Sequence, residues 1–314
     1  MSFSSEVKHE ICTRDLDDLA IRAQLSSFFH LNATMHIINN KWELQIEILN
    51  ATIAKRMFQL VKHRYDAETE LTVLKRQNFN KGNVFRLRVK DKAMFILEDL
   101  GIYDSDGLRA VPLDTIVVQE SFAQAYLAGA FLASGSVNAP TRADYHLEVS
   151  SDRESLAHFM VELLKRFGLS AKVTKRRSKY VVYIKKADHI ADFLKIVGAY
   201  NMTMHFEDVR IQRDFRNSLT RLDNMELAND MKTMKAGNRQ MDAILNLMEN
   251  NRFNHMDKKL IDAGNLRMDH PEASLNELIE IYYSETGNRI SKSGLQHRFN
   301  KILELSEKLD EKKA

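Results

Sequence analysis

Hydrophobic positions in the first two hundred residues follow the same order twice. The segment 23–34 (AQLSSFFHLNAT) matches the segment 125–136 (AYLAGAFLASGS), and both keep the 3.6-residue spacing of a helix. Short strands with alternating side chains follow at 44–48 and 145–149. An amphipathic helix, a basic hairpin and a closing helix come next, at 51–65, 71–90 and 93–101 in the first copy and at 152–167, 171–186 and 190–198 in the second.

This duplication predicts the fold class. Each copy reads helix, two strands, helix, two strands, helix, so we expect an α+β domain of two αββαββα repeats related by a pseudo-twofold axis. The period is too long, and the copies are too few, for a solenoid. We expect this domain to cover 1–205, with repeats of about 1–105 and 106–205.

The segment that follows, 206–252, is expected to be a helical linker. It contains no proline, and its arginines at 210, 213, 216 and 221 are mixed with acids. Such a mixture is typical of one or two solvent-exposed helices that carry charged side chains of both signs. The linker is either a spacer or a functional element whose arginines contact DNA phosphates or set the angle between domains.

The last segment, 253–314, has the pattern of an all-α helix-turn-helix domain, from about Ser274 to Glu307. His270-Pro271 breaks the chain, and Ser274 with Glu277 forms a capping box at the start of a helix. A turn is expected over 285–289, and a supporting helix upstream over 258–268. The buried stripe of the first helix is expected to be Leu275, Leu278, Ile279 and Tyr282.

The second helix of this pair resembles a recognition helix. Leu295, Phe299 and Ile302 form its apolar stripe, which leaves polar and basic side chains on the other faces. Such side chains read base edges and hold phosphates in the major groove of double-stranded DNA. The candidate DNA-binding residues are Ser291, which is also the expected N-cap, Lys292, Ser293, Gln296, His297, Arg298 and Lys301.

Composition narrows the class of protein. The chain has 314 residues and a formal charge of +3, and its single cysteine, Cys12, forbids an intrachain disulfide. No apolar run is long enough to cross a membrane, and the N-terminus lacks the apolar core of a signal peptide. These features predict a cytoplasmic protein without a membrane partner. Basic stretches at 171–187 and 286–303, which contain no acids, favour contact with a polyanion.

Both expected hairpins are basic, which predicts a strand-built surface for DNA or an acidic partner protein. In the first copy Arg86, Arg88 and Lys90 alternate with apolar residues and share one face, whereas Tyr183 replaces the counterpart of Arg86 in the second. The remaining candidate contacts are Lys75 and Arg76 in the first hairpin and Lys175, Arg176, Arg177, Lys179 and Lys185 in the second.

The helix at 125–136 carries small residues on one face. Gly129, Ala133 and Ser136 recur at helical spacing. Glycine costs a helix interior about 1 kcal/mol relative to alanine, so its advantage here is the close approach of another backbone. The expected partner is the matching helix of the first copy, at Ser26 and Ser27.

The segment Leu127 to Gly135 resembles the LAGLIDADG motif of homing endonucleases, and the doubled αββαββα order matches their fold. In active members an acid before the final glycine of each motif binds the catalytic divalent metals. Those positions hold Asn32 and Ser134 here, and the motif's earlier Asp, two residues before each of them, is replaced by His30 and Leu132. The resemblance therefore implies a scaffold with no catalytic residues, no metal site and no cofactor. The alternative is a nuclease with non-standard ligands.

Nearly the whole chain resembles the WhiA family, in the stretches 1–11, 127–135, 216–244 and 260–302. That resemblance implies a DNA-binding protein at the nucleoid that acts in transcription regulation, cell division, chromosome segregation and, in some lineages, sporulation. Thr220 and Met225 depart from the family pattern. A regulatory or division protein is a second expected partner, and an adaptor role in division or segregation is the alternative function. The internal duplication makes a monomer plausible.

Overall fold

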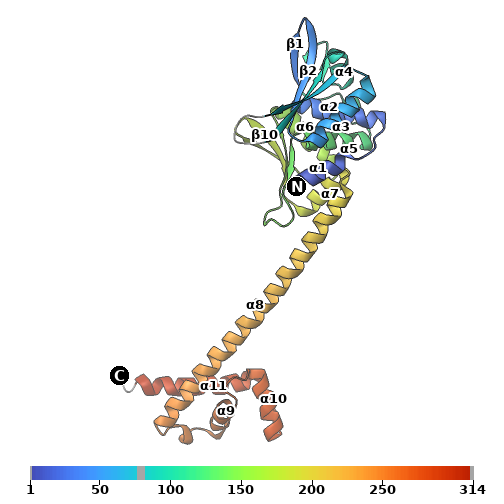
Figure 1. Ribbon diagram of the computed structural model, residues 1–314. Coiled ribbons are helices and arrows are strands. Elements are labelled where there is room, and N and C mark those ends of the chain that lie inside the picture. The colour runs from blue at the N-terminus through green and yellow to red at the C-terminus, as the bar shows by residue number, and fades with distance from the viewer. Residues whose placement is uncertain (1, 76–81, 312–314) are drawn as a thin grey trace. The chain divides into compact units, whose positions relative to one another are not determined.

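The computed structural model describes residues 2–75 and 82–311 (Figure 1). The chain forms two compact units, 1–213 (unit 1) and 214–314 (unit 2). The division lies inside the segment interpreted above as the linker.

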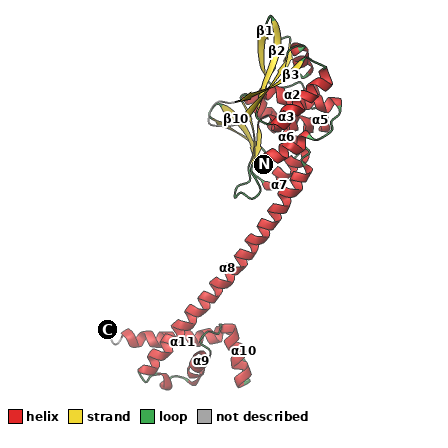
Figure 2. Cartoon of the chain, in the orientation of Figure 1, coloured by secondary structure: helices red, strands yellow, loops and turns green. Residues whose placement is uncertain are grey.

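The first repeat of unit 1 forms one antiparallel sheet with helices on one of its faces (Figure 2). The order of strands in the sheet is β1-β2-β4-β3. The repeat follows helix α1 (Phe3–Cys12) and consists of α2 (Asp18–Asn32), β1 (Thr34–Ile38), β2 (Lys41–Ile48), α3 (Ala51–Tyr65), β3 (Thr69–Lys75), β4 (Asn83–Val89) and α4 (Ala93–Asp99).

The second repeat has the same organisation, with strand order β7-β8-β10-β9. A small hairpin, β5 (Tyr103–Asp104) and β6 (Gly107–Leu108), and a 3-10 turn, η1 (Asp114–Ile116), connect the repeats. The repeat consists of α5 (Glu120–Ser134), β7 (Gly135–Val137), β8 (Leu147–Ser151), α6 (Glu154–Arg166), β9 (Lys172–Arg176), β10 (Lys179–Ile184) and α7 (Ala187–Ile196). The predicted α+β duplication is therefore confirmed.

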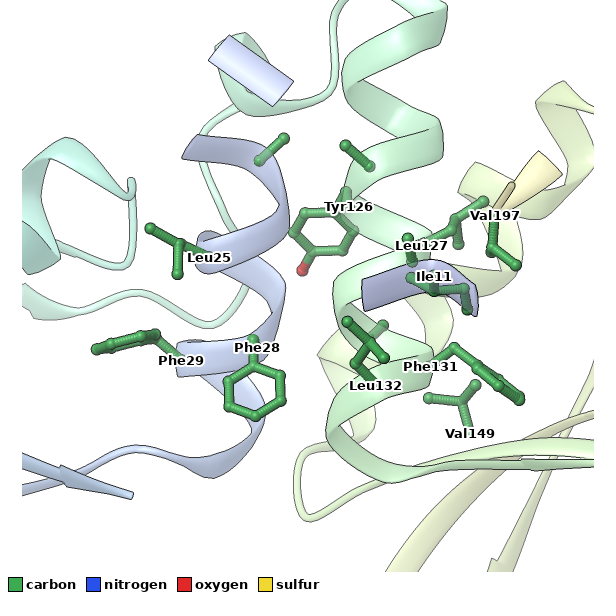
Figure 3. Close-up of a cluster of buried hydrophobic side chains, with 14 of the residues drawn as sticks. Ile11, Leu25, Phe28, Phe29, Tyr126, Leu127, Phe131, Leu132, Val149 and Val197 are labelled. Atoms are coloured by element: carbon green, nitrogen blue, oxygen red, sulfur yellow. The ribbon is translucent and has the colours of Figure 1, made fainter. Parts of the chain in front are cut away.

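Helices α2 and α5 lie side by side at the centre of unit 1, with the large apolar side chains labelled in Figure 3 around them. A Cβ atom at Gly129 would overlap the Gln24 carbonyl oxygen and Ser27 Oγ, so the predicted close approach at this glycine is confirmed. Helix α5 ends at Ser134, and Ser136 lies in β7. The expectation that Ser136 belongs to the helix face was wrong, because the chain turns into the sheet at Gly135.

Unit 2 is helical and has its own apolar core. Helix α8 (Tyr200–Glu249) extends across the division between the units and is followed by η2 (Phe253–His255), α9 (Lys258–Asp269), α10 (Leu275–Thr286) and α11 (Lys292–Glu311). The core includes Ile244, Phe253, Leu278, Phe299 and Ile302. Residues 206–249 of the expected linker thus lie in one helix, which begins before residue 206.

Candidate nucleic-acid interface

The start of α10 is fixed by the predicted capping box. Ser274 Oγ accepts a hydrogen bond from the Glu277 amide at 3.3 Å, and Glu277 Oε2 accepts one from the Ser274 amide at 2.7 Å. The hydrogen bond from the Ser274 amide is the main cause that lowers the pKa of the Glu277 carboxyl. At the other end, Gly287 takes a left-handed conformation at φ 70°. The turn therefore begins at Gly287 rather than at Glu285, because the helix continues to Thr286.

Helix α11 begins as its sequence predicts. Ser291 Oγ accepts a hydrogen bond from the Gly294 amide at 3.1 Å, which satisfies one free donor of the first turn. The expected core residues Leu295, Phe299 and Ile302 are fully buried. Exposed side chains at the start of the helix are those of Ser291, Lys292, Ser293 and His297, and Gln296 donates to Asn300 Oδ1 at 3.0 Å.

Two basic residues of α11 have partners within unit 2. Arg298 Nη1 donates to the Lys259 carbonyl oxygen at 3.4 Å, and its guanidinium lies over the Tyr282 ring, 5.7 Å from the centroid. Lys301 Nζ forms an ion pair with Glu304 at 2.9 Å. Arg298 thus joins α11 to both α9 and α10. This role could not be predicted from the sequence, since only the fold brings Lys259 and Tyr282 to the arginine.

Arg86 and Arg88 of β4, and Lys90 directly after it, are balanced by acids on neighbouring strands. Each of these three residues contacts a carboxylate of β2, of β3 or of Glu68, the residue before β3. The ion pairs are Arg86–Glu47 at 2.9 Å, Arg88–Glu43 at 2.8 Å and Lys90–Glu70 at 3.0 Å. Strand register explains the pairing, because Arg86 lies opposite Glu47 on the same face. This face is therefore far less cationic than the hairpin sequence alone indicates.

The basic residues of the second sheet are divided between its two faces. Lys175 pairs in register with Tyr180, and Arg176 pairs with Lys179, so these adjacent residues point to opposite sides. Arg176 contacts Glu148 at 3.3 Å, and Lys179 contacts Asp152 at 3.6 Å. The cations of this strand pair therefore do not share one face of the sheet.

The other hairpin candidates are scattered. Arg177 lies in the β9–β10 turn with φ 54°, and Lys185 lies over the Tyr183 ring. Lys75 is exposed at the end of β3, and Arg76 is outside the described residues.

The two positions that hold acids in active LAGLIDADG proteins form hydrogen bonds to the backbone here. Asn32 Nδ2 donates to the Ala133 carbonyl oxygen at 3.3 Å, and Ser134 Oγ donates to the Ser150 carbonyl oxygen at 2.6 Å. Across residues 2–75 and 82–311, no group of three or more His, Cys, Asp or Glu side chains is arranged to hold a metal ion. An amide and a hydroxyl do not supply the negative charge that two hard cations require.

His30, beside Asn32, is held as a neutral buried side chain. Arg153 Nη1 donates to His30 Nε2 at 3.0 Å and to the Arg109 carbonyl oxygen at 3.2 Å. Burial and the positive charge of Arg153 lower the pKa of His30 to about 4. The residue packs inside unit 1 and is poorly placed to bind a metal.

The arginines at the start of α8 serve packing within unit 1. Arg210 pairs with Asp188 at 2.6 Å, and Arg213 donates to the Arg142 carbonyl oxygen at 2.6 Å while lying over the Tyr145 ring. Arg216 and Arg221 are exposed on α8 in unit 2. The first two arginines are therefore positioned to anchor α8 rather than to meet phosphates.

Family models match three parts of the chain. Residues 19–103 match the WhiA N-terminal LAGLIDADG-like domain, residues 123–216 match the WhiA LAGLIDADG-like domain, and residues 219–306 match the WhiA C-terminal HTH domain. No helix in the described part of the chain is long and apolar enough to cross a membrane.

A relative and a solved structure each cover nearly the whole chain. A probable cell division protein WhiA of Staphylococcus aureus (strain JH9) is 38% identical over 310 residues, which is 98% of each chain. The crystal structure of full-length DUF199/WhiA from Thermatoga maritima matches with a TM-score of 0.61 and 20% identity, covering 98% of this chain and 99% of that one. A crystal structure of the N-terminal LAGLIDADG domain of DUF199/WhiA matches with a TM-score of 0.51 and 20% identity, covering 63% of this chain and 90% of that one. The two solved structures support the fold.

Proposed function

Because the chain belongs to the WhiA family, we propose that it is a sequence-specific DNA-binding protein that regulates transcription. It would act in cell division and chromosome segregation, and in sporulation in lineages that sporulate. It would be located in the cytoplasm, associated with the nucleoid. The observation that carries the proposal is the helix-turn-helix of α10 and α11, whose second helix begins with exposed polar and basic side chains.

The exposed N-terminal half of α11 supports direct readout of the major groove. Gln296 can pair with an adenine edge and Lys292 with guanine or with a phosphate. Ser291, Ser293 and His297 share this exposed region. Arg298 and Lys301 would add positive charge beside this region. Their side chains also contact Lys259, Tyr282 and Glu304 within unit 2.

The test is DNA binding by the full chain, measured by fluorescence anisotropy on sites selected from a random library. Gln296→Ala should cost about 1–3 kcal/mol at one base position, and Lys292→Ala should lower the salt slope by about 1 if Lys292 binds a phosphate. Arg298→Ala is less informative, since it would also loosen α11 from α9. The matched control is Arg239→Ala, an exposed arginine of unit 2 that pairs with Glu307 on the surface. Full binding by the Lys292→Ala/Gln296→Ala double variant would refute the recognition-helix assignment.

A second candidate function is protein adaptor, with residues 1–205 as a scaffold for a regulatory or division protein. The ion pairs of Arg86, Arg88 and Lys90 favour this use over DNA binding by the first sheet, because a DNA-binding surface needs cations free for phosphates. Arg86→Ala should then leave both DNA affinity and the salt slope unchanged. Affinity purification after nuclease digestion should still recover the partner. A drop of about one in the salt slope for Arg86→Ala would instead show that the first sheet contacts DNA phosphates.

A further inference from the structure

Helix α8 carries an exposed apolar face inside unit 2. Leu227, Met231 and Met234 are 61%, 64% and 54% exposed, and Leu245 and Met248 are exposed as well. With Asn238 and the half-buried Met241, they follow one another at alternating steps of four and three residues. We call these seven residues, Leu227, Met231, Met234, Asn238, Met241, Leu245 and Met248, the α8 seam.

This spacing is the heptad pattern of a coiled coil, not the pattern of the core of unit 2. The core face of the same helix uses other positions, Ala243, Ile244 and Leu247, which are buried. A repeat of 3.5 residues keeps a stripe facing one partner helix over several turns, provided that the two helices supercoil. Exposed apolar side chains in such a register mark a contact surface.

We propose that the α8 seam binds the α8 seam of a second copy of this chain as a parallel, in-register, two-stranded coiled coil. The polar position in the seam supports this occupant. Asn238 falls at an a position, with Met231 and Leu245 at the a positions before and after it. A single asparagine at a specifies register and strand number, because it pairs with its own copy across the axis. In an antiparallel pair, a positions meet d positions, so Asn238 would face an apolar methionine and lose its partner.

Charge beside the seam fits the same arrangement. Asp230 falls at a g position and Lys235 at the following e position, and both are exposed. In a parallel dimer, g of one helix lies beside the next e of its partner, so Asp230 would pair with Lys235 of the other copy, twice by symmetry. The proposal concerns self-association and does not depend on the proposed DNA binding.

The first test is the mass of the full chain by sedimentation equilibrium, up to about 100 µM, a range that reports weak dimers. The unmodified chain should dimerise, and Met231→Lys/Met234→Lys should weaken the association by about tenfold or more. The matched control is Phe215→Lys/Leu222→Lys, equally exposed apolar residues of α8 that lie outside the seam. A monomer throughout this range would overturn the proposal, as would a dimer broken by the control pair and kept by the seam pair.

The second test decides orientation. Met234→Cys should form an intermolecular disulfide on mild oxidation, because d positions face one another only in a parallel, in-register pair. The unmodified chain is the control, since its one thiol, Cys12, is buried. Asp230→Lys should weaken the dimer, and adding Lys235→Asp should restore it. An antiparallel pair would give a different result: Asp242→Lys would restore a dimer weakened by Lys235→Asp, and Met234→Cys would form no intermolecular disulfide. That outcome would overturn the proposed arrangement.

Discussion

Gly129 allows the backbones of α2 and α5 to approach each other, and the cost of filling that space is predictable. A Cβ there would meet the carbonyl oxygen of Gln24, which is part of a helix and cannot move aside cheaply. Gly129→Ala should therefore destabilise unit 1 by about 1–3 kcal/mol or more in chemical denaturation. Gly82→Ala is the control, because nothing lies within 4 Å of the Cβ it would add. Equal stability of the two variants would contradict the packing described here.

His30 should make unit 1 less stable in mild acid. Its pKa is lowered from 6.5 to about 4 in the folded chain, so between these values the unfolded state binds more protons. The contribution is fully present above about pH 6.5 and is lost as the pH falls toward 4, on the order of 3 kcal/mol in all. Denaturant midpoints across this window should fall more steeply for the unmodified chain than for His30→Gln. Parallel curves would show that His30 does not titrate in this way.

At the scale of elements, Arg267 joins three parts of unit 2. Its side chain is 2% exposed, donates from Nε to Gln240 of α8 at 2.9 Å, and donates from Nη1 to the Ala273 carbonyl oxygen at 2.6 Å before α10. Burial lowers its pKa, and neutral acceptors around it accept hydrogen bonds from its Nε and Nη1.

Arg267→Ala should destabilise unit 2 by about 3 kcal/mol, since it leaves buried acceptors unpaired and opens a cavity. Thermal unfolding of the full chain should then show an early transition from unit 2. Arg239→Ala should cost less than about 1 kcal/mol, because its pair with Glu307 is on the surface. Similar losses in both variants would mean that Arg267 contributes no more than a surface charge.

At the scale of the whole molecule, we predict that the chain does not cleave DNA. The polar side chains at the two acid positions, Asn32 and Ser134, are bonded to backbone carbonyl oxygens instead of being free to bind cations. Supercoiled plasmid incubated with the pure full chain and Mg²⁺ or Mn²⁺ should stay intact. Metal-dependent nicking that Asn32→Ala/Ser134→Ala abolishes would contradict this prediction.

Local sequence patterns determined the elements, because capping, turns and side-chain period act over a few residues. The αββαββα duplication, the capping box at Ser274 and the core stripe of α11 were all predictable in this way. The small residues of α5 also predicted the close approach of α2, since Gly129 leaves room for the backbone of another helix. The main local error, the end of α10, was an error of two residues in a boundary.

The tertiary structure decided how charges combine, because ion pairs form between residues distant in the sequence. Arg86 and Glu47 belong to different strands, and only their register places the carboxylate against the guanidinium. A signal was present in the sequence, since Glu43 and Glu47 alternate along β2 as the arginines do along β4, but the pairing of strands was needed to use it. The same reason applies to Arg298, whose sequence position indicates a DNA contact while the fold also makes it a link between α9, α10 and α11.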